Sequence, residues 1–235
     1  MSIQVTNLTK VYGAQRAVDG ISFNLKPGEI VGFLGPNGAG KSTTMKMLTG
    51  YLKPSGGTAK VAEYDVVDQS MPAKRSIGYL PEHNPLYLDM YVREFLLFSG
   101  KLYGMKGESL KARVDEMVQL CGLEVEKRKK IGQLSKGYRQ RVGLAQSFLH
   151  DPAVLILDEP TTGLDPNQIL EIRELIRTAG KNKTVLFSTH IMQEVEALCD
   201  RVIIINKGKV ASDTSIGALR ETGNSLEDIF RSLTN

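Results

Sequence analysis

A glycine-rich segment that follows a short apolar run limits what this chain can fold into more than any other feature. Residues 35–43 fit the pattern G-x-x-x-x-G-K-[ST] and come directly after the strand-like residues 30–34. Glycines let the backbone turn tightly and approach an anion, and the helix predicted after the segment adds its positive end. A chance glycine-rich turn followed by Lys-Ser would leave the flanking strand and helix unexplained. The segment therefore predicts a nucleoside triphosphate site.

Residue types in this segment match the parts of a phosphate cradle. Lys41 is expected to neutralise the β- and γ-phosphates, and the Ser42 hydroxyl is expected to ligate Mg²⁺. Successive backbone N–H groups of the turn are expected to point at phosphate oxygens. The predicted nucleotide-binding residues are Gly35, Pro36, Asn37, Gly38, Ala39, Gly40, Lys41, Ser42 and Thr43.

Size and composition predict one large domain, or a core with an inserted subdomain. The 235 residues are 41% hydrophobic, which is enough for a sizeable core. A net charge of +4 is too small to imply a nucleic-acid partner by itself. Cys121 and Cys199 lie among apolar residues and are expected to be buried thiols. No N-terminal signal pattern is seen and the apolar runs are strand-sized, so any membrane pore is expected to belong to another chain.

Hydrophobic periodicity predicts a strand-rich core with a helical insertion. Strands are expected within residues 3–34 and at 58–61, 77–80, 153–157 and 184–188, followed by a hairpin over 202–211. Residues 54–57 are expected to form a loop. From about residue 88 to 122 apolar residues recur at helical spacing, and these stripes are assigned to the core rather than to cofactor contacts. The end of the chain is expected to be polar, with one short amphipathic piece at 226–233.

A basic stretch lies between residues 124 and 141. Its seven Lys and Arg residues are explained most simply as a solvated charged face. Nucleic-acid binding is the alternative, but no aromatic residues are interleaved with these charges. Ser135 is predicted to cap the N-terminus of the helix that follows.

Two further strands are predicted to end in chemically active side chains. In open parallel sheets, ligands bind beyond the carboxyl ends of the strands. Asp158 is therefore expected to reach Mg²⁺, and Glu159 is expected to polarise an attacking water. A turn with a helix cap is the alternative for this pair. His190 follows the next strand and is expected to contact the γ-phosphate, with a purely structural histidine as the alternative.

Several independent segments resemble the motifs of ATP-binding-cassette (ABC) ATPases. Residues 134–140, Leu-Ser-Lys-Gly-Tyr-Arg-Gln, resemble the signature segment of that family. Residues 162–165 resemble its D-loop, and His190 resembles its switch histidine. The order and spacing match over roughly residues 3–212.

The resemblance implies an α/β fold: a P-loop ATPase core with an N-terminal antiparallel β-subdomain and an inserted α-helical subdomain. The chain would be a single ABC ATPase domain. Its core would comprise residues 1–86 and 151–212, its helical subdomain with the signature segment residues 87–150, and its short tail residues 213–235.

The family also implies that ATP is sandwiched between two copies packed head to tail. Ser135 and the amides that open its helix, including that of Gly137, form an anion site with the helix dipole. This site would serve the γ-phosphate bound by the partner copy. Tyr12 falls where the family stacks an aromatic ring on adenine, although a turn or core aromatic is its ordinary role.

Two positions depart from the family pattern. Lys136 replaces a small residue of the signature segment and Tyr138 replaces its Gln, so Lys136 either adds charge near the incoming phosphate or faces solvent. Glu82 stands where the family has a Gln that contacts Mg²⁺ or the attacking water and links to the membrane subunit. Glu82 is expected to ligate Mg²⁺, while adding negative charge to the site.

Residues 79–82, Tyr-Leu-Pro-Glu, together with the signature segment resemble bacterial ABC-2 type exporter ATPases, which include drug-resistance and gliding-motility-associated members. This resemblance implies ATP hydrolysis that drives export through a separate integral-membrane permease, at the inner face of the membrane and without nucleic acid. The alternatives are a soluble ABC ATPase that acts on nucleic acid or the ribosome, a binding-only switch and a P-loop kinase. The transported substrate is not indicated.

Overall fold

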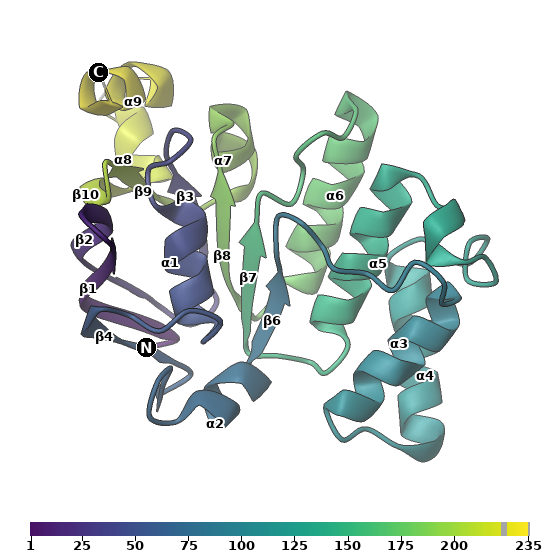
Figure 1. Cartoon of the computed structure of the whole chain (residues 1–235). Coiled ribbons are helices and arrows are strands. Elements are labelled where there is room, and N and C mark those ends of the chain that lie inside the picture. The colour runs from purple at the N-terminus through teal and green to yellow at the C-terminus, as the bar shows by residue number, and fades with distance from the viewer. Residues whose placement is uncertain (222–224, 235) are drawn as a thin grey trace.

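The computed structural model describes residues 1–221 and 225–234 and contains two β-sheets flanked by helices (Figure 1). The smaller sheet has four strands in the order β2-β1-β4-β5, and the larger has six in the order β10-β9-β3-β8-β7-β6. A group of helices, α3, α4 and α5, lies to one side of the large sheet, away from the small one (Figure 1). The predicted α/β class with an antiparallel β-subdomain and a helical insertion is confirmed.

The small sheet is antiparallel and is formed mainly by the N-terminal residues. Its strands are β1 (Ile3–Tyr12), β2 (Gln15–Leu25), β4 (Gly56–Val61) and β5 (Tyr64–Asp65). In β2 buried and less buried side chains alternate towards the end of the strand, where Ile21, Phe23 and Leu25 are buried. These side chains pack in a hydrophobic cluster with residues of α1 (Lys41–Leu48) and of the large sheet.

The large sheet is parallel except at one edge. Its strands are β3 (Ile30–Leu34), β6 (Ile77–Leu80), β7 (Val154–Asp158), β8 (Thr184–Thr189), β9 (Arg201–Asn206) and β10 (Lys209–Ser215). Only β10 is antiparallel to its neighbour, with which it forms the predicted hairpin. Every residue of β7 and β8 is buried, as expected for strands covered on both faces.

Helices cover the two faces of this sheet. The helix α1 lies on the face next to the small sheet, whereas α6 (Pro166–Ala179) and α7 (Met192–Leu198) contribute to the other hydrophobic cluster. Asp165 caps α6, because its side chain accepts a hydrogen bond from the Gln168 N–H at 3.0 Å.

The helical subdomain consists of α3 (Val92–Leu102), α4 (Gly107–Leu120), the short 3₁₀ helix η1 (Ile131–Gln133) and α5 (Lys136–Phe148). Its apolar stripes are buried, as expected, and they join the same cluster as α6 and α7. Ser135 caps α5, and its hydroxyl accepts a hydrogen bond from the Tyr138 N–H at 3.3 Å.

Some local expectations are wrong. Gly56 and Gly57, expected in a loop, belong to β4, and Gly57 has φ of +74° beside a shift in the β1–β4 register. The strand β10 runs to Ser215, beyond the predicted core boundary at residue 212. The helix α2 (Ser70–Arg75) was not expected.

The predicted tail contains more helix than the one short amphipathic piece that the sequence indicates. It contains α8 (Ile216–Glu221) and α9 (Leu226–Thr234), which are drawn in yellow-green and yellow in Figure 1. Leu226 of the expected amphipathic piece is buried. Residues 222–224 and 235 of this tail lie outside the described residues. Among the residues described, no helix combines the length and the apolar character that crossing a membrane requires.

Candidate nucleotide-binding site

Three neighbouring parallel strands end at one edge of the large sheet and carry most of the predicted site. The strand β8 lies between β3 and β7, and Asp158 of β7 is paired in register with Ser188 of β8. The glycine-rich segment follows β3, Glu159 follows β7, and His190 follows β8. Sheet topology alone therefore brings together groups more than a hundred residues apart.

The glycine-rich segment is packed so closely that two of its glycines tolerate no side chain. Gly40 has φ of +107°, and a Cβ added to it would lie 2.5 Å from the Ala17 carbonyl oxygen. A Cβ added to Gly35 would lie 2.5 Å from the Ile205 carbonyl oxygen. The helix α1 begins directly afterwards, at Lys41. These contacts fix the turn in the shape that a phosphate cradle requires.

Lys41 is a buried cation at the start of α1. Its ammonium donates to the carbonyl oxygens of Gly35 at 2.8 Å and Pro36 at 3.2 Å. The same ammonium lies 3.4 Å from Glu159 Oε1, and the two side chains are only 6% and 7% exposed. A cation and an anion are thus held close together with little water around them.

Asp158 is the last residue of β7, directly before Glu159, and one of its carboxylate oxygens accepts two hydrogen bonds from hydroxyl groups. Its Oδ1 accepts from Ser188 at 2.5 Å and from Ser42 at 3.2 Å. Burial raises the pKa of the Asp158 carboxyl above its ordinary value, while the two serine hydroxyls act in the opposite direction. The site therefore holds a desolvated carboxyl that a nearby cation would stabilise in its charged form.

Glu159 connects Lys41 to His190. Its Oε2 lies 2.9 Å from His190 Nδ1 and accepts a hydrogen bond from the Thr162 hydroxyl at 3.1 Å. Its backbone N–H donates to the Ser188 hydroxyl at 2.9 Å, and its φ is +49°. Because every one of these partners is fixed, the carboxylate has a defined orientation at the edge of the sheet.

Of these groups, five line a cavity of about 550 Å³: Lys41, Ser42, Glu159, Thr162 and His190. Tyr12, which is 48% exposed, and Glu82 both line it, together with residues of the glycine-rich segment. Its full lining is Tyr12, Gln15, Ala17, Asn37, Gly38, Gly40, Lys41, Ser42, Thr43, Glu82, Glu159, Thr162 and His190.

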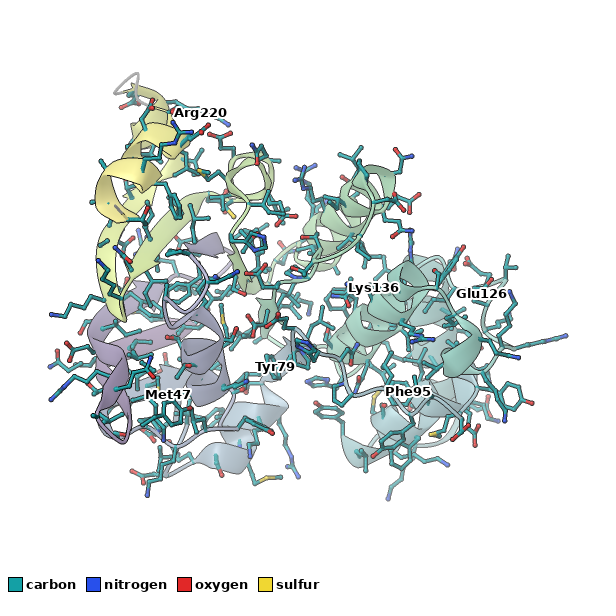
Figure 2. All side chains as sticks on the ribbon, turned by 45° about the horizontal axis from the view of Figure 1, so that its top comes forward. Met47, Tyr79, Phe95, Glu126, Lys136 and Arg220 are labelled. Atoms are coloured by element: carbon teal, nitrogen blue, oxygen red, sulfur yellow. The ribbon has the colours of Figure 1, made fainter. Side chains whose placement is uncertain are left out.

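Six predicted site residues, all within the described part of the chain, do not line this cavity: Gly35, Pro36, Ala39, Asp158, Ser135 and Gly137. Asp158 instead lines a second cavity, of about 500 Å³. Ser135 and Gly137 belong to the start of α5 in the helical subdomain. The start of α5 instead contacts the D-loop region of the same chain. A Cβ added to Gly163 would lie 2.0 Å from the ammonium of Lys136, so this side chain lies over Gly163 while Lys136 remains exposed, as one of the two sequence interpretations expected. Figure 2 shows Lys136 where the helical subdomain faces the sheet core.

A magnesium ion fits the donor set of this site. The hydroxyl of Ser42 and the carboxylate of Asp158 are hard oxygen donors within hydrogen-bond distance of each other. Glu82 lines one cavity together with Ser42 and another together with Asp158. No group of three or more His, Cys, Asp and Glu side chains in the described part of the chain could hold a metal alone. An ion bound here would therefore need phosphate oxygens and water to complete its coordination, as Mg²⁺ ordinarily does.

Three functional contacts were missed by sequence reasoning. Ser188 bridges Asp158 and Glu159, Thr162 donates to Glu159, and Gln15 lines the cavity. Two of these residues had a sequence signal: Ser188 is a hydroxyl residue near the end of an otherwise apolar strand, and Thr162 begins the segment that resembles the D-loop.

The family described as "ABC transporter" matches residues 18–162, which include the phosphate cradle, the signature segment and Asp158-Glu159. The chain belongs to the ABC transporter family. It is an ATP-binding subunit of that family and an ATPase.

Individual relatives agree with this assignment. The Nod factor export ATP-binding protein I of Burkholderia orbicola (strain AU 1054) is 40% identical over 221 residues, which are 94% of this chain and 73% of that protein. A solved ATP-binding subunit of an ABC transporter matches with a TM-score of 0.90 at 30% identity, over 100% of both chains. A dimeric ATP-binding cassette solved in a post-hydrolysis state with ADP and Pi matches with a TM-score of 0.84 at 26% identity. That match covers 91% of this chain and 98% of the solved one.

Proposed function

We propose that this ABC subunit hydrolyses ATP to drive export through a separate integral-membrane permease. The observation that carries the proposal is the contact chain Lys41–Glu159–His190 at the wall of the cavity. A cation for the phosphates, a carboxylate for the water and an imidazole for the γ-phosphate are the groups that ATP hydrolysis needs. Export, rather than uptake, is supported by the similarity to the Nod factor export protein.

The residues have separate tasks in the proposed mechanism. Backbone N–H groups of residues 35–43 and the Lys41 ammonium bind the β- and γ-phosphates. Glu159 accepts a hydrogen bond from the attacking water, while His190 holds Glu159 in place and contacts the γ-phosphate. Tyr12 stacks on the adenine ring. Mg²⁺, held by Ser42, Asp158 and Glu82, would neutralise charge on the phosphate oxygens when bound.

The second half of the nucleotide site is proposed to come from another copy of the chain. Ser135, which is exposed, and the N–H of Gly137 lie at the N-terminus of α5, where the helix dipole favours an anion. Since these groups do not line the chain's own cavity, they are available to the γ-phosphate held by a partner copy. The similarity to a solved cassette dimer supports this head-to-tail arrangement. ATP would then hold the dimer together.

The permease is proposed to dock at the second cavity, of about 500 Å³, between the sheet core and the helical subdomain. Tyr79, Asn84 and Tyr103 line it, and the Tyr79 hydroxyl and the Asn84 amide nitrogen are buried without a hydrogen-bond partner among the described residues. Figure 2 shows Tyr79 between the two parts of the molecule. Docking here would place the chain on the cytoplasmic face of the membrane.

Turnover of Glu159→Gln tests the catalytic part of this proposal. The variant is expected to bind ATP as the wild type does and to release phosphate about 10²–10⁴-fold more slowly, because it lacks the base. Glu124→Gln, at an exposed position of the helical subdomain, is the matched control and should keep full turnover. Phosphate release near the wild-type rate in Glu159→Gln would remove Glu159 from the catalytic role.

A further inference from the structure

Glu194 is a buried carboxylate that none of the proposed catalytic steps uses. It belongs to α7 and is only 1% exposed. Each of its two oxygens accepts a hydrogen bond from a threonine: Oε1 from the Thr161 hydroxyl, and Oε2 from the Thr189 hydroxyl at 2.6 Å. A carboxylate only accepts hydrogen bonds, so both threonines are oriented as donors towards it.

The two threonines belong to the two loops that carry Glu159 and His190. Thr161 lies two residues after Glu159, in the loop that follows β7. Thr189 is the last residue of β8, directly before His190, and its hydroxyl also accepts a hydrogen bond from the Ile191 N–H at 3.0 Å. The hydroxyl of Thr189 thereby fixes the backbone on both sides of His190. The Glu194 side chain joins this segment to the loop after β7, because it accepts hydrogen bonds from both Thr189 and Thr161.

The charge of Glu194 is compensated only weakly. Among the described residues, the one cation within 4.0 Å is Arg173 of α6, whose guanidinium lies 4.0 Å from Oε1. The Nε atom of Arg173 is itself buried without a hydrogen-bond partner in the described part of the chain. A buried carboxylate with one distant cation contributes little net stability, because its desolvation offsets the attraction. The role of Glu194 is therefore to be sought in the orientation that it gives to the two threonine side chains.

We propose that Glu194 is a positioning residue for ATP hydrolysis: it ties Thr161 to Thr189 and so holds Glu159 and His190 in contact at 2.9 Å. This inference rests on the proposed roles of Glu159 and His190. Without the tie, Thr161 and Thr189 lose their common anchor, and among the described residues only the hydrogen bonds of Glu159 to Ser188, Thr162 and His190 still orient the base. The loss is expected in kcat rather than in ATP affinity, because Glu194 touches neither the phosphate cradle nor the cavity lining.

The test compares Glu194→Gln with Glu196→Gln, a control at an exposed position of the same helix. A glutamine keeps the shape but can accept at only one of the two positions. We expect Glu194→Gln to lower kcat at least tenfold and to leave the ATP dissociation constant within about twofold. Thr189→Val should give a loss of similar size, since it cuts the same tie at its other end.

A second readout does not depend on activity. The chain has three histidines, so the ring-proton NMR resonances of His83, His150 and His190 can be followed separately. In the nucleotide-free chain, Glu194→Gln should move the His190 resonances and leave those of His83 and His150 in place, which shows that the fold is intact. Glu196→Gln should move none of the three.

Several outcomes would overturn the inference. They are unchanged kcat in Glu194→Gln, unmoved His190 resonances, or an ATP affinity that falls as far as kcat does. Its failure is distinguishable from failure of the proposed function. If His190→Ala and Glu159→Gln lose turnover while Glu194→Gln does not, only the inference about Glu194 is wrong. If all three retain turnover, the proposed catalytic roles are wrong as well.

Discussion

Two cavities of similar size lie on either side of Glu82, and their walls differ in chemistry. The cavity of about 550 Å³ is lined by the glycine-rich turn, Lys41, Glu159 and His190. The cavity of about 500 Å³ contains three tyrosines and two prolines in its lining, whereas Tyr12 is the only tyrosine or proline among the described residues that line the first cavity. The rest of its lining is Lys46, Glu82, His83, Asn84, Gln146 and Asp158. Glu82 lines both.

The two proposed roles, nucleotide binding and protein docking, therefore rest on the residues that line each cavity and not on the cavity volumes. Buried charges and backbone N–H groups suit a polyanion, whereas exposed aromatic rings suit a protein partner. Glu82 belongs to both linings. A molecule bound in one cavity could therefore change the position of a side chain that also lines the other cavity. The substitutions below that test a cavity each change a residue that lines only one of the two: Lys41, Lys46, Tyr51 or Asp158.

The largest effect is expected from Lys41→Ala. Removing the ammonium from the phosphate cradle should weaken ATP binding by at least 100-fold, measured by titration calorimetry, because no other cation lies among the described residues that line this cavity except His190 when protonated.

Lys46→Ala is the matched control for that variant. Lys46 belongs to the same helix, α1, but is exposed and lines the second cavity. Its removal should leave ATP binding unchanged. Equal losses in both variants would mean that the two cavities are not chemically separate.

A smaller effect, on the partner alone, is expected from Tyr51→Glu. Tyr51 is 79% exposed at the second cavity, so the fold should tolerate a carboxylate there, but a partner that packs on the Tyr51 ring would lose that contact. Co-purification with the co-expressed permease should fall at least tenfold, while the isolated chain keeps its ATPase rate. Tyr64→Glu, on the small sheet, should change neither; undiminished co-purification of Tyr51→Glu would exclude the second cavity as the docking site.

The smallest effect is expected from Asp158→Asn, measured as thermal stability. Because burial raises the pKa of Asp158, its contribution to stability is greatest at acid pH and is lost as the pH rises through the raised value. At pH 7 the nucleotide-free variant should therefore unfold a few degrees higher than the wild type, and the gap should narrow towards pH 4.

Binding of Mg²⁺ and ATP should reverse the order of thermal stability, so that the wild type becomes more stable than Asp158→Asn. With Mg²⁺ and ATP present, the wild type should gain stability and Asp158→Asn should gain less, since it lacks the charged oxygen donor. Asp68→Asn, at an exposed position, should follow the wild type throughout. A nucleotide-free Asp158→Asn that is less stable than the wild type at pH 7 would contradict the assignment of Asp158 as a destabilising buried charge.

Features written in consecutive residues could be predicted from the sequence. The phosphate cradle, the acidic end of β7 and the caps by Ser135 and Asp165 each depend on a few neighbouring residues. Their meeting at one edge followed from the rule for parallel sheets. Gly57 led to a wrong prediction of a loop. Its positive φ instead occurs within β4, beside a shift in the register between β1 and β4.

Contacts between distant segments could not be predicted. The pairing of Thr161 with Glu194 joins residues 33 apart, and the side chain of Lys136 reaches Gly163 from another subdomain. No periodicity or motif encodes which hydroxyl meets which carboxylate, since that depends on how the two loops and α7 pack. The second cavity is likewise assembled from separate segments and has no motif of its own.

The central claim is that ATP is held between the phosphate cradle of one copy and the Ser135 end of α5 in another. Sedimentation velocity of Glu159→Gln, with and without ATP, tests it most directly. We predict a monomer without nucleotide, a dimer with ATP, and a monomer again when Ser135→Arg is added. A monomer at every concentration with ATP bound, or a dimer indifferent to Ser135→Arg, would contradict the account.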